Sequence, residues 1–348
     1  MPETIHETTT KKTPLLEVIN LRKYFPIEQG FLRKSSQAVK AVDDISFTIY
    51  EGETFGLVGE SGSGKTTLGR CIVRGLDPTQ GVINLHLPEE GVIDLASLDK
   101  KGLRAVRRHF HMIFQDPYSS LDPRMTVRDI IAEPIRNNKL ASGNEVNDRV
   151  IKLMETVGLE VQHLKRYPHA FSGGQRQRIG IARSLAPQPR LIVCDEAVSA
   201  LDVSIQAQIL NLLQDLQEEF NLTYLFIAHD LSVVEHIADR VAVMYVGQIV
   251  EMSETQDLFA KPKHPYTEAL LSAVPTTDPE IKMDRIILPG EIANPADPPT
   301  GCYFHPRCQY AQDICRTKKP VTEEIEPGHF VACHLAKELD LRGVPQLS

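Results

Sequence analysis

The sequence of 348 residues predicts an α/β fold, in which helices cover the faces of a largely parallel sheet. Short apolar runs typical of buried strands alternate with amphipathic stretches typical of helices, which is the pattern of parallel strands joined by helical crossovers. One apolar run, 54–58, leads directly into a glycine-rich segment, 59–66, and a helical pattern follows. A strand, a glycine-rich loop and a helix in this order are typical of a phosphate-binding loop.

The expected elements follow from apolar runs and from the glycines and prolines that bound them. Strands are expected at 15–21, 39–49, 54–58, 82–98 (with a turn at 88–91), 110–114, 190–194, 223–228, 241–245 and 248–251. Helices are expected at 66–76, 173–185 and 204–220. The polar, helical pattern from 116 indicates an inserted helical subdomain, about 116–180, and prolines after 185 end the helix before them.

Composition separates three regions of the chain. Residues 1–14 are rich in Thr, Glu and Lys and are expected to form a disordered tail. Residues 15–255 carry the strand and helix pattern, and 256–348, where prolines become frequent and four cysteines occur, are expected to form a C-terminal domain. A chain of this length accommodates two domains, or one large domain with an appendage.

Charge and hydropathy exclude several classes of protein. The net charge is −8 with no basic half, which argues against nucleic acid as a partner, because phosphate-backbone binding needs clustered Lys and Arg. No apolar run approaches the roughly 18 residues of a membrane span, and the first residues lack the apolar core of a secretory signal. The chain is therefore expected in the cytosol, acting at a membrane only by docking onto a spanning partner.

The glycine-rich loop is the first candidate site. Its glycines permit backbone conformations closed to other residues, so that successive N–H groups can surround a phosphate at the start of a helix. Lys65 is expected to bridge the β- and γ-phosphates, and the Thr66 hydroxyl to ligate Mg²⁺. A chance glycine turn is the alternative. The nucleotide-binding residues are predicted to be Gly59, Glu60, Ser61, Gly62, Ser63, Gly64, Lys65, Thr66 and Thr67.

Two carboxylates end the apolar run 190–194. Their place at the carboxyl end of a buried strand puts them on the sheet edge where the phosphates would lie. Asp195 is expected to hold Mg²⁺ through water, and Glu196 to act as general base toward the attacking water. The alternative is a pair of acids that merely caps the following helix.

A second glycine turn opens the helix expected from 173. Ser172, Gly173, Gly174 and Gln175 place a hydroxyl and bare N–H groups at a helix start, which is an anion site in its own right. Because Lys65 and Thr66 already complete one phosphate site, the second is expected to serve the nucleotide of another chain. A plain helix cap is the alternative.

Together these three segments make the chain resemble an ATP-binding-cassette (ABC) ATPase over about 15–255. The resemblance implies a P-loop NTPase with a RecA-like core, an antiparallel β subdomain and a helical subdomain, followed here by the small cysteine-containing domain. It also implies roles for single positions. Gln115 matches a glutamine that touches Mg²⁺, His229 a histidine that contacts the γ-phosphate, and Phe25, with Tyr24 as competitor, an aromatic that stacks on adenine. The loop that meets the opposing subunit is Ser199, Ala200, Leu201 and Asp202.

The resemblance implies a two-chain mechanism. Two cassettes face head to tail, and each ATP lies between the Lys65 side of one chain and the Ser172 side of the other. ATP binding closes the pair and hydrolysis at Glu196 reopens it, with the membrane partner following through the cleft near Gln115. Phe171 stands where leucine is usual in the family, and both are apolar.

Further phrases resemble the ATPases of bacterial dipeptide and oligopeptide importers, over about 15–335. They are 24–27, 116–124 and 264–275, and the closest resemblance is to the second of two paired ATPases. This implies a second, homologous ATPase in a heterodimer, two transmembrane permease subunits and, indirectly, an extracytoplasmic solute-binding protein. The chain would lie peripherally on the cytoplasmic face of the inner membrane. Nickel and some glycoside importers share the arrangement, so peptide is expected and nickel stays an alternative.

Four cysteines cluster near the C-terminus without a Cys-x-x-Cys pair. They are Cys302, Cys308, Cys315 and Cys333. Four thiolates suit a 4Fe-4S cluster, and the importer resemblance implies one here; zinc and simply buried thiols are the alternatives.

Other functions remain to be weighed against peptide import. A soluble ABC ATPase acting on DNA or ribosomes would carry long coiled-coil insertions or tandem cassettes, which this chain lacks. An exporter ATPase is often fused to membrane helices and lacks the 264–275 extension. A redox-regulated ATPase is compatible with import.

Overall fold

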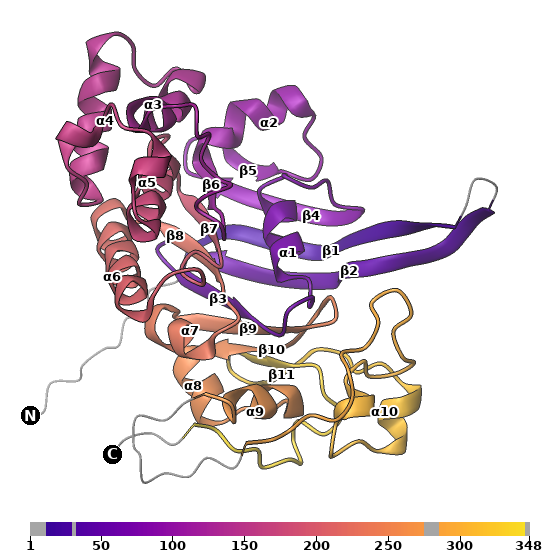
Figure 1. Ribbon diagram of the computed structural model, residues 1–348. Coiled ribbons are helices and arrows are strands. Elements are labelled where there is room, and N and C mark those ends of the chain that lie inside the picture. The colour runs from indigo at the N-terminus through magenta and orange to yellow at the C-terminus, as the bar shows by residue number, and fades with distance from the viewer. Residues whose placement is uncertain (1–11, 30–32, 275–284, 345–348) are drawn as a thin grey trace, which may run out of the picture.

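The computed structural model describes residues 12–29, 33–274 and 285–344, and their strands form two sheets. The first sheet has the order β2-β1-β4-β5 and is antiparallel throughout. The second has the order β11-β12-β10-β9-β3-β8-β7-β6. Figure 1 shows the antiparallel sheet beside the second sheet, which is called the central sheet below. The helices α3–α5 lie at the opposite end of the molecule from the C-terminal segment, residues 256–274 and 285–344.

The last five strands in the order of the second sheet run parallel. They are β6 (Phe110–Ile113), β7 (Leu191–Asp195), β8 (Thr223–Ile227), β3 (Thr54–Val58) and β9 (Arg240–Tyr245). Every residue of β3, β7, β8 and β9 is buried, as expected for parallel strands that are covered on both faces. The carboxyl ends of these strands therefore meet at one edge of the sheet.

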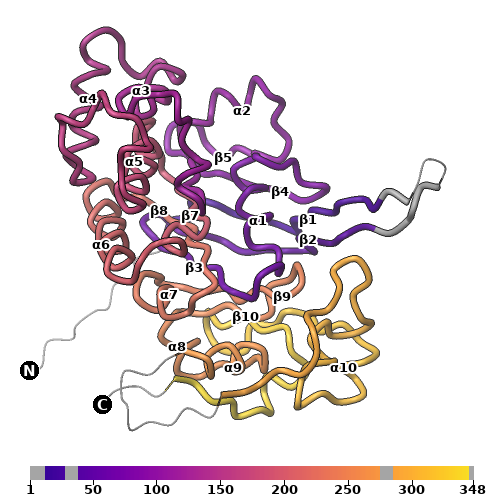
Figure 2. The backbone as a smooth tube through the Cα atoms, viewed as in Figure 1, coloured from indigo at the N-terminus to yellow at the C-terminus, as the bar shows by residue number. Residues whose placement is uncertain are grey.

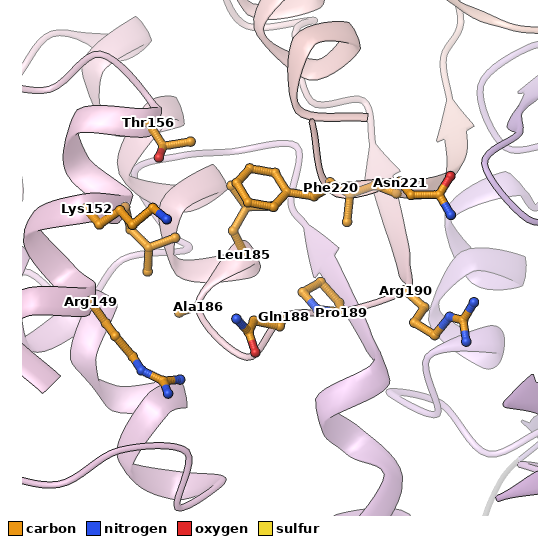
Figure 3. Close-up of a pocket in the computed structure, with 12 residues that line it drawn as sticks. Arg149, Lys152, Thr156, Leu185, Ala186, Gln188, Pro189, Arg190, Phe220 and Asn221 are labelled. Carbon is orange, nitrogen blue, oxygen red and sulfur yellow. The ribbon is translucent and has the colours of Figure 1, made fainter. Parts of the chain in front are cut away.

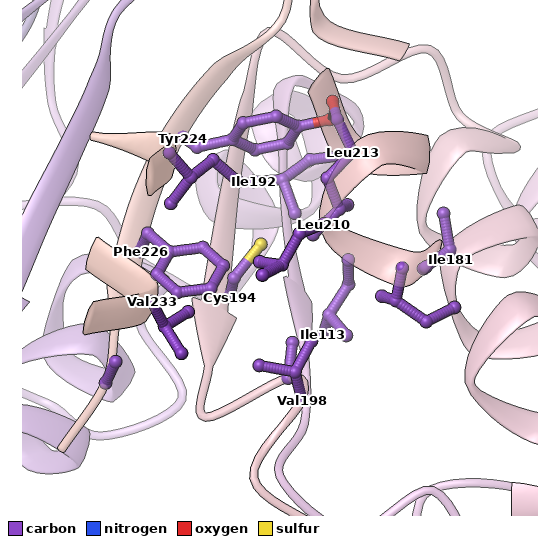
Figure 4. Packing of buried hydrophobic residues seen from close by; sticks show 14 of the residues in the cluster. Ile113, Ile181, Ile192, Cys194, Val198, Leu210, Leu213, Tyr224, Phe226 and Val233 are labelled. Atoms are coloured by element: carbon purple, nitrogen blue, oxygen red, sulfur yellow. Dashed lines mark hydrogen bonds between the residues drawn. The ribbon is translucent and has the colours of Figure 1, made fainter. Parts of the chain in front are cut away.

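Alternate residues of these strands enter different cores. Ile192 and Cys194 of β7, with Tyr224 and Phe226 of β8, pack against α5 and α6, as Figure 4 shows. The intervening residues of the same strands belong to a second core, formed with α1 and the antiparallel sheet. Because successive side chains of a strand point to opposite faces of the sheet, one sheet contributes to both cores.

The helices and remaining strands have the following bounds. The helices are α1 (Lys65–Ile72), α2 (Lys100–Val106), α3 (Val127–Asn137), α4 (Asn144–Thr156), α5 (Gly173–Leu185), α6 (Val203–Phe220), α7 (Leu231–Ile237), α8 (Thr255–Ala260), α9 (Pro265–Leu271) and α10 (Asp313–Thr317). The remaining strands are β1 (Pro14–Gln29), β2 (Arg33–Tyr50), β4 (Gln80–Leu87), β5 (Gly91–Asp94), β10 (Gln248–Glu254), β11 (Glu323–Glu326) and β12 (His329–Val331).

One predicted helix is shorter in the structure than expected, and two predicted strands are longer. The helix expected over 66–76 ends at Ile72, because Arg74 takes a left-handed backbone (φ 51°) and the N–H groups of Gly75 and Leu76 turn back to the Arg70 carbonyl. Strands β1 and β2 extend beyond the apolar runs, since their backbone pairing continues through polar residues with several bulges.

The C-terminal segment continues the central sheet. β12 pairs with β10, so residues of this segment extend the sheet beyond β9 (Figure 2). The predicted tail, 1–14, lies mostly outside the described residues, and the predicted domain limits stay predictions. No helix in the described part of the chain combines the length and apolar character that a membrane span requires.

Candidate active site

The glycine-rich loop joins β3 to α1 (Figure 1), and close packing against neighbouring backbone shapes it. A Cβ at Gly59 would lie 2.2 Å from the Met244 carbonyl oxygen, and one at Gly64 would lie 2.0 Å from the Ala41 carbonyl oxygen. Both glycines have positive φ, 148° and 105°. Only glycine fits these positions, so the loop is held against β2 and the end of β9.

Lys65 folds back over this loop. Its side chain is buried, and Nζ donates to the carbonyl oxygens of Gly59 at 2.7 Å and Glu60 at 2.9 Å, with the Ser63 hydroxyl at 3.4 Å. Burial lowers the pKa of Lys65. A buried ammonium group beside the start of a helix is suited to bind a polyphosphate. Of the remaining loop residues, Ser61 and Gly62 are exposed, and Thr67 lies half-buried in α1.

A hydroxyl and a carboxylate meet beside the loop. Thr66 Oγ1 donates to Asp195 Oδ1 at 2.8 Å, which joins the start of α1 to the end of β7. Burial raises the pKa of Asp195, and the Thr66 hydrogen bond opposes that rise. Hydroxyl and carboxylate oxygens are hard ligands of the kind that Mg²⁺ accepts, so these two residues fit the predicted magnesium site.

Two polar side chains, those of Gln115 and His229, contact the Glu196 carboxylate. Gln115 Nε2 donates to Glu196 Oε2 at 2.7 Å, and His229 Nδ1 lies 3.3 Å from the same oxygen. These residues follow β6, β7 and β8, so three neighbouring strand ends bring them together. Glu196 has φ 48°, a left-handed conformation uncommon for this residue type and typical of strained functional positions. Gln115 thus contacts the predicted base, and no hydrogen bond among the described residues joins it to Thr66 or Asp195.

The second glycine turn begins α5 with a complete capping box. The Gln175 N–H donates to Ser172 Oγ at 3.3 Å, and the Ser172 N–H donates to Gln175 Oε1 at 3.0 Å. A Cβ at Gly174 would lie 2.6 Å from Ile205 Cγ2 of α6, so packing alone accounts for this glycine. Ser172 is exposed, and no hydrogen bond in the described chain joins this turn to the phosphate-binding loop.

The loop predicted to meet another subunit lies next to Glu196. The Ser199 hydroxyl donates to the Glu196 carbonyl oxygen at 3.0 Å, and a Cβ at Gly173 would lie 3.5 Å from Leu201 Cδ2. Ser199, Ala200 and Asp202 are exposed. One short segment therefore connects the carboxylate to the glycine turn of α5.

Tyr24 and Phe25, the two candidates for stacking on adenine, differ in their contacts. Tyr24 Oη donates to the buried carboxylate of Asp43, and burial raises the pKa of Tyr24. Phe25 is 37% exposed, with Lys23 Nζ 4.9 Å from its ring centroid. An exposed ring is available for stacking, which favours Phe25 over Tyr24.

Comparison with known proteins gives two family matches and many relatives. A model described as ABC transporter matches residues 42–199, and one described as oligopeptide/dipeptide transporter, C-terminal region, matches residues 250–315. The oligopeptide transport ATP-binding protein AppF of Bacillus subtilis is 51% identical over 331 residues, which cover 94% of this chain and 99% of that protein. The chain belongs to the family of ABC transporter ATP-binding proteins. The probable peptide ABC transporter ATP-binding protein y4tS of Sinorhizobium fredii is 52% identical over 321 residues, covering 92% and 90% of the two chains.

Solved ABC cassettes share this fold. The dimeric cassette MJ0796, in a post-hydrolysis state bound to ADP and Pi, aligns with a TM-score of 0.59 at 27% identity, covering 69% of this chain and 99% of that chain. CbiO1 from Clostridium perfringens aligns with a TM-score of 0.60 at 27% identity, covering 71% and 91%. The predicted ABC ATPase fold is confirmed, and as a member of this family the chain is an ATPase that uses ATP and Mg²⁺.

The predicted iron–sulfur cluster is wrong. Within the described residues, no group of three or more His, Cys, Asp or Glu side chains is arranged to hold a metal ion. Burial raises the pKa of Cys308 to about 11 and that of Cys333 to about 12, and it also raises the pKa of Cys302. Cys302, Cys308, Cys315 and Cys333 are free cysteines.

Sequence reasoning missed the residues that hold Glu60. The Glu60 N–H donates to Tyr266 Oη at 2.9 Å, and the Glu60 carboxylate accepts from both terminal nitrogens of Arg307 at 2.7 and 3.1 Å. Both partners lie in the C-terminal segment, more than 200 positions from the loop, and no short motif marks such a contact.

A cavity of about 650 Å³ lies at the other edge of the central sheet (Figure 3). It is lined by the ends of α4, α5 and α6 and by the residues that precede β7 and β8, including the exposed ring of Phe220. None of the predicted site residues lines it. The predicted catalytic residues and the phosphate-binding loop therefore lie at the carboxyl ends of the strands, and this cavity lies at the amino ends.

Proposed function

We propose that this chain is the ATP-hydrolysing subunit of an ABC importer for dipeptides or oligopeptides. The observation that carries the proposal is the placement of Glu196, with Gln115 and His229 on one of its oxygens, beside Thr66, Asp195 and the phosphate-binding loop. Relatives about 50% identical over nearly the whole chain are named as oligopeptide transport or peptide import ATP-binding proteins. Nickel occurs in none of these names, which favours peptide as cargo.

Each residue of the site has a chemical role in this proposal. The loop N–H groups and Lys65 bind the β- and γ-phosphates, and Phe25 stacks on the adenine. Glu196 accepts a proton from the attacking water, while Gln115 and His229 orient its carboxylate and reach toward the γ-phosphate. Mg²⁺ at Thr66 and Asp195 would neutralise charge on the phosphate oxygens.

The geometry also supports a two-chain site. Ser172 and Gln175 are exposed at the start of α5, and this turn has no hydrogen bond to the phosphate-binding loop in the described chain. A helix start of this kind suits the γ-phosphate of an ATP held by a partner. We infer that the partner is a second, homologous ATPase, as a heterodimer, and that the loop from Ser199 to Asp202 lies in their interface.

We further propose where the membrane partners act. A groove of about 810 Å³ between α1, α2, α3 and β6 is lined by Phe114, the residue before Gln115. A permease segment in this groove would move with Gln115 and thus with the state of the nucleotide site. The assembly would comprise two transmembrane permease subunits and an extracytoplasmic binding protein, with this chain peripheral on the cytoplasmic face of the inner membrane.

The test is uptake by cells that carry the wild-type chain, Glu196→Gln or the control Glu218→Gln, whose carboxylate lies on the exposed side of α6. Labelled dipeptides and oligopeptides are supplied, with nickel in parallel. Loss of peptide uptake in Glu196→Gln alone supports the proposal. Loss of nickel uptake with normal peptide uptake would identify nickel as the cargo. Normal uptake of dipeptides, oligopeptides and nickel would contradict the importer assignment.

A further inference from the structure

Two residues of the C-terminal segment hold the start of the phosphate-binding loop. Tyr266 Oη accepts a hydrogen bond from the backbone N–H of Glu60, and Arg307 makes a two-pronged ion pair with the Glu60 carboxylate. Tyr266 is fully buried, and the side chain of Arg307 is 8% exposed. Paired, poorly hydrated Arg–carboxylate contacts of this geometry fix orientation as well as charge.

Tyr266 is itself held rigidly. It lies in α9, where its N–H donates to His264 Nδ1 at 3.0 Å. The backbone N–H groups of Lys263 and His264 donate to the carboxylate of Glu251, which is fully buried in β10. The Tyr266 hydroxyl is therefore anchored through α9 to the central sheet.

Arg307 is held by an aromatic cluster. Its guanidinium carbon lies 5.9 Å from the centroid of the Tyr245 ring, which itself packs at 4.7 Å from the Tyr266 ring and 5.3 Å from the Phe304 ring. Tyr245 ends β9, beside the loop. The cluster orders the guanidinium before any ligand arrives, which reduces the entropic cost of holding Glu60.

The charge of Glu60 matters because its loop has to bind a polyphosphate. The same residue offers its carbonyl oxygen to Lys65 Nζ at 2.9 Å, so its carboxylate belongs to the loop that meets the phosphates. The Glu60 side chain is 27% exposed, and without a partner its negative charge would repel these anions. Arg307 cancels that charge, and its pairing also leaves the backbone of Glu60 fixed.

We propose that Tyr266 and Arg307 are positioning residues of the nucleotide site, so that the C-terminal segment sets the affinity of the phosphate-binding loop for ATP. This inference rests on the proposed function, because it requires that the loop bind ATP. In this arrangement Tyr266 fixes the backbone of the loop entrance, and Arg307 neutralises Glu60. Any displacement of the C-terminal segment would weaken nucleotide binding without touching Glu196.

The first experiment is a double-mutant cycle on the full chain with the fluorescent nucleotide mant-ATP and Mg²⁺. Arg307→Gln is expected to bind mant-ATP about tenfold more weakly, because it leaves the Glu60 carboxylate without its partner. Glu60→Gln also loses the ion pair but removes the anion itself, so its loss of affinity should be smaller than that of Arg307→Gln, and adding it to Arg307→Gln should restore most of the lost affinity. Recovery of this kind is not expected if Arg307 only supports folding.

Two further variants complete the test. Tyr266→Phe keeps the ring packing, removes the acceptor for the Glu60 N–H, and should raise Kd and KM about fivefold with unchanged kcat. Lys337→Gln is the matched control, since Lys337 also pairs with a carboxylate of the segment, Glu323 at 3.1 Å, with both side chains exposed. Thermal melts establish that each variant is folded.

The outcomes separate this inference from the proposed function. Unchanged Kd values in folded Arg307→Gln and Tyr266→Phe, with normal binding by the wild type, overturn the inference and leave the ATPase assignment standing. The inference is also overturned if Arg307→Gln weakens mant-ATP binding and the addition of Glu60→Gln does not restore the affinity. Failure of the wild-type chain to bind mant-ATP overturns both.

Discussion

Glu196 holds its two neighbours through one oxygen atom. Gln115 and His229 both contact Oε2, and the hydrogen bonds of the described chain leave Oε1 for a water molecule. The side chain is 17% exposed while that of His229 is 55% exposed, so the carboxylate is sheltered and its histidine faces outward. The sheltered Glu196 carboxylate is suited to act as an oriented general base, and the exposed His229 is accessible to a bound ligand.

The first prediction concerns this carboxylate. Glu196→Gln keeps the size of the side chain and removes the proton acceptor, so phosphate release by the assembled ATPase should fall by about 10²–10⁴-fold while ATP still binds. Phosphate release and mant-ATP binding are measured on the same preparations, with Glu218→Gln as control. Near-normal hydrolysis in Glu196→Gln would remove Glu196 from this role.

Motifs predicted which residues form the candidate site, but they did not predict the hydrogen bonds between those residues. Sequence reasoning assigned Gln115 to Mg²⁺, and the structure adds a hydrogen bond from its amide to Glu196. That contact depends on the spacing of β6 and β7 in the sheet, which a motif does not encode. Tyr24 and Phe25 were likewise alternatives in the sequence, and the hydrogen bond from the Tyr24 hydroxyl to Asp43 favours Phe25.

At the scale of elements, the packing of α5 on α6 explains a glycine that sequence reasoning assigned to anion binding. Gly174 lies at the start of α5, where an added Cβ would approach Ile205 Cγ2 to 2.6 Å. Since Ile205 branches at Cβ, its methyl group cannot move away without a change of rotamer. The glycine turn is thus constrained from within the chain, whatever anion it meets.

The second prediction follows from that contact. Gly174→Ala should lower the free energy of unfolding by about 1–3 kcal/mol, the usual cost of overpacking, despite the better helix propensity of alanine. Urea unfolding measures the change. Ile205→Ala provides the space, so the double variant should lose less than the sum of the single variants; strict additivity would contradict the contact.

Long apolar elements were easier to predict than short polar ones. The runs at β3, β7, β8 and β9 are buried on both faces and read directly as strands. By contrast, β11 and β12 are four and three residues long, and β11 contains three glutamates. Their strand character comes from pairing with each other and with β10, which is a tertiary contact.

At the scale of the whole molecule, the C-terminal segment is joined to the rest of the chain at several independent points. β12 pairs with β10, the Lys40 N–H donates to the Pro295 carbonyl oxygen, and Arg307 reaches Glu60. Composition marked this segment as distinct because it is rich in proline and cysteine. Composition carries no information about contacts between distant residues, so the connection to the nucleotide site appeared only in the structure.

The third prediction is a loss of stability below neutral pH that depends on His264. This side chain is 1% exposed, and burial lowers its pKa to about 3, against about 6.5 in the unfolded chain. Below pH 6.5 the unfolded state therefore binds more protons than the folded state, so the free energy of unfolding falls as pH falls toward 3. From pH 7.5 to 5.5 this single group should remove roughly 1.4 kcal/mol.

The matched variant is His264→Asn, because asparagine also caps a helix start and can accept from the Tyr266 N–H that His264 Nδ1 now satisfies. Urea unfolding of both chains at pH 7.5 and 5.5 isolates the histidine, since all carboxylates are common to the two. The wild type should lose about 1.4 kcal/mol more than the variant across this interval. Equal losses would mean that His264 is protonated in the folded state, and the anchor of Tyr266 would then have to tolerate a buried charge.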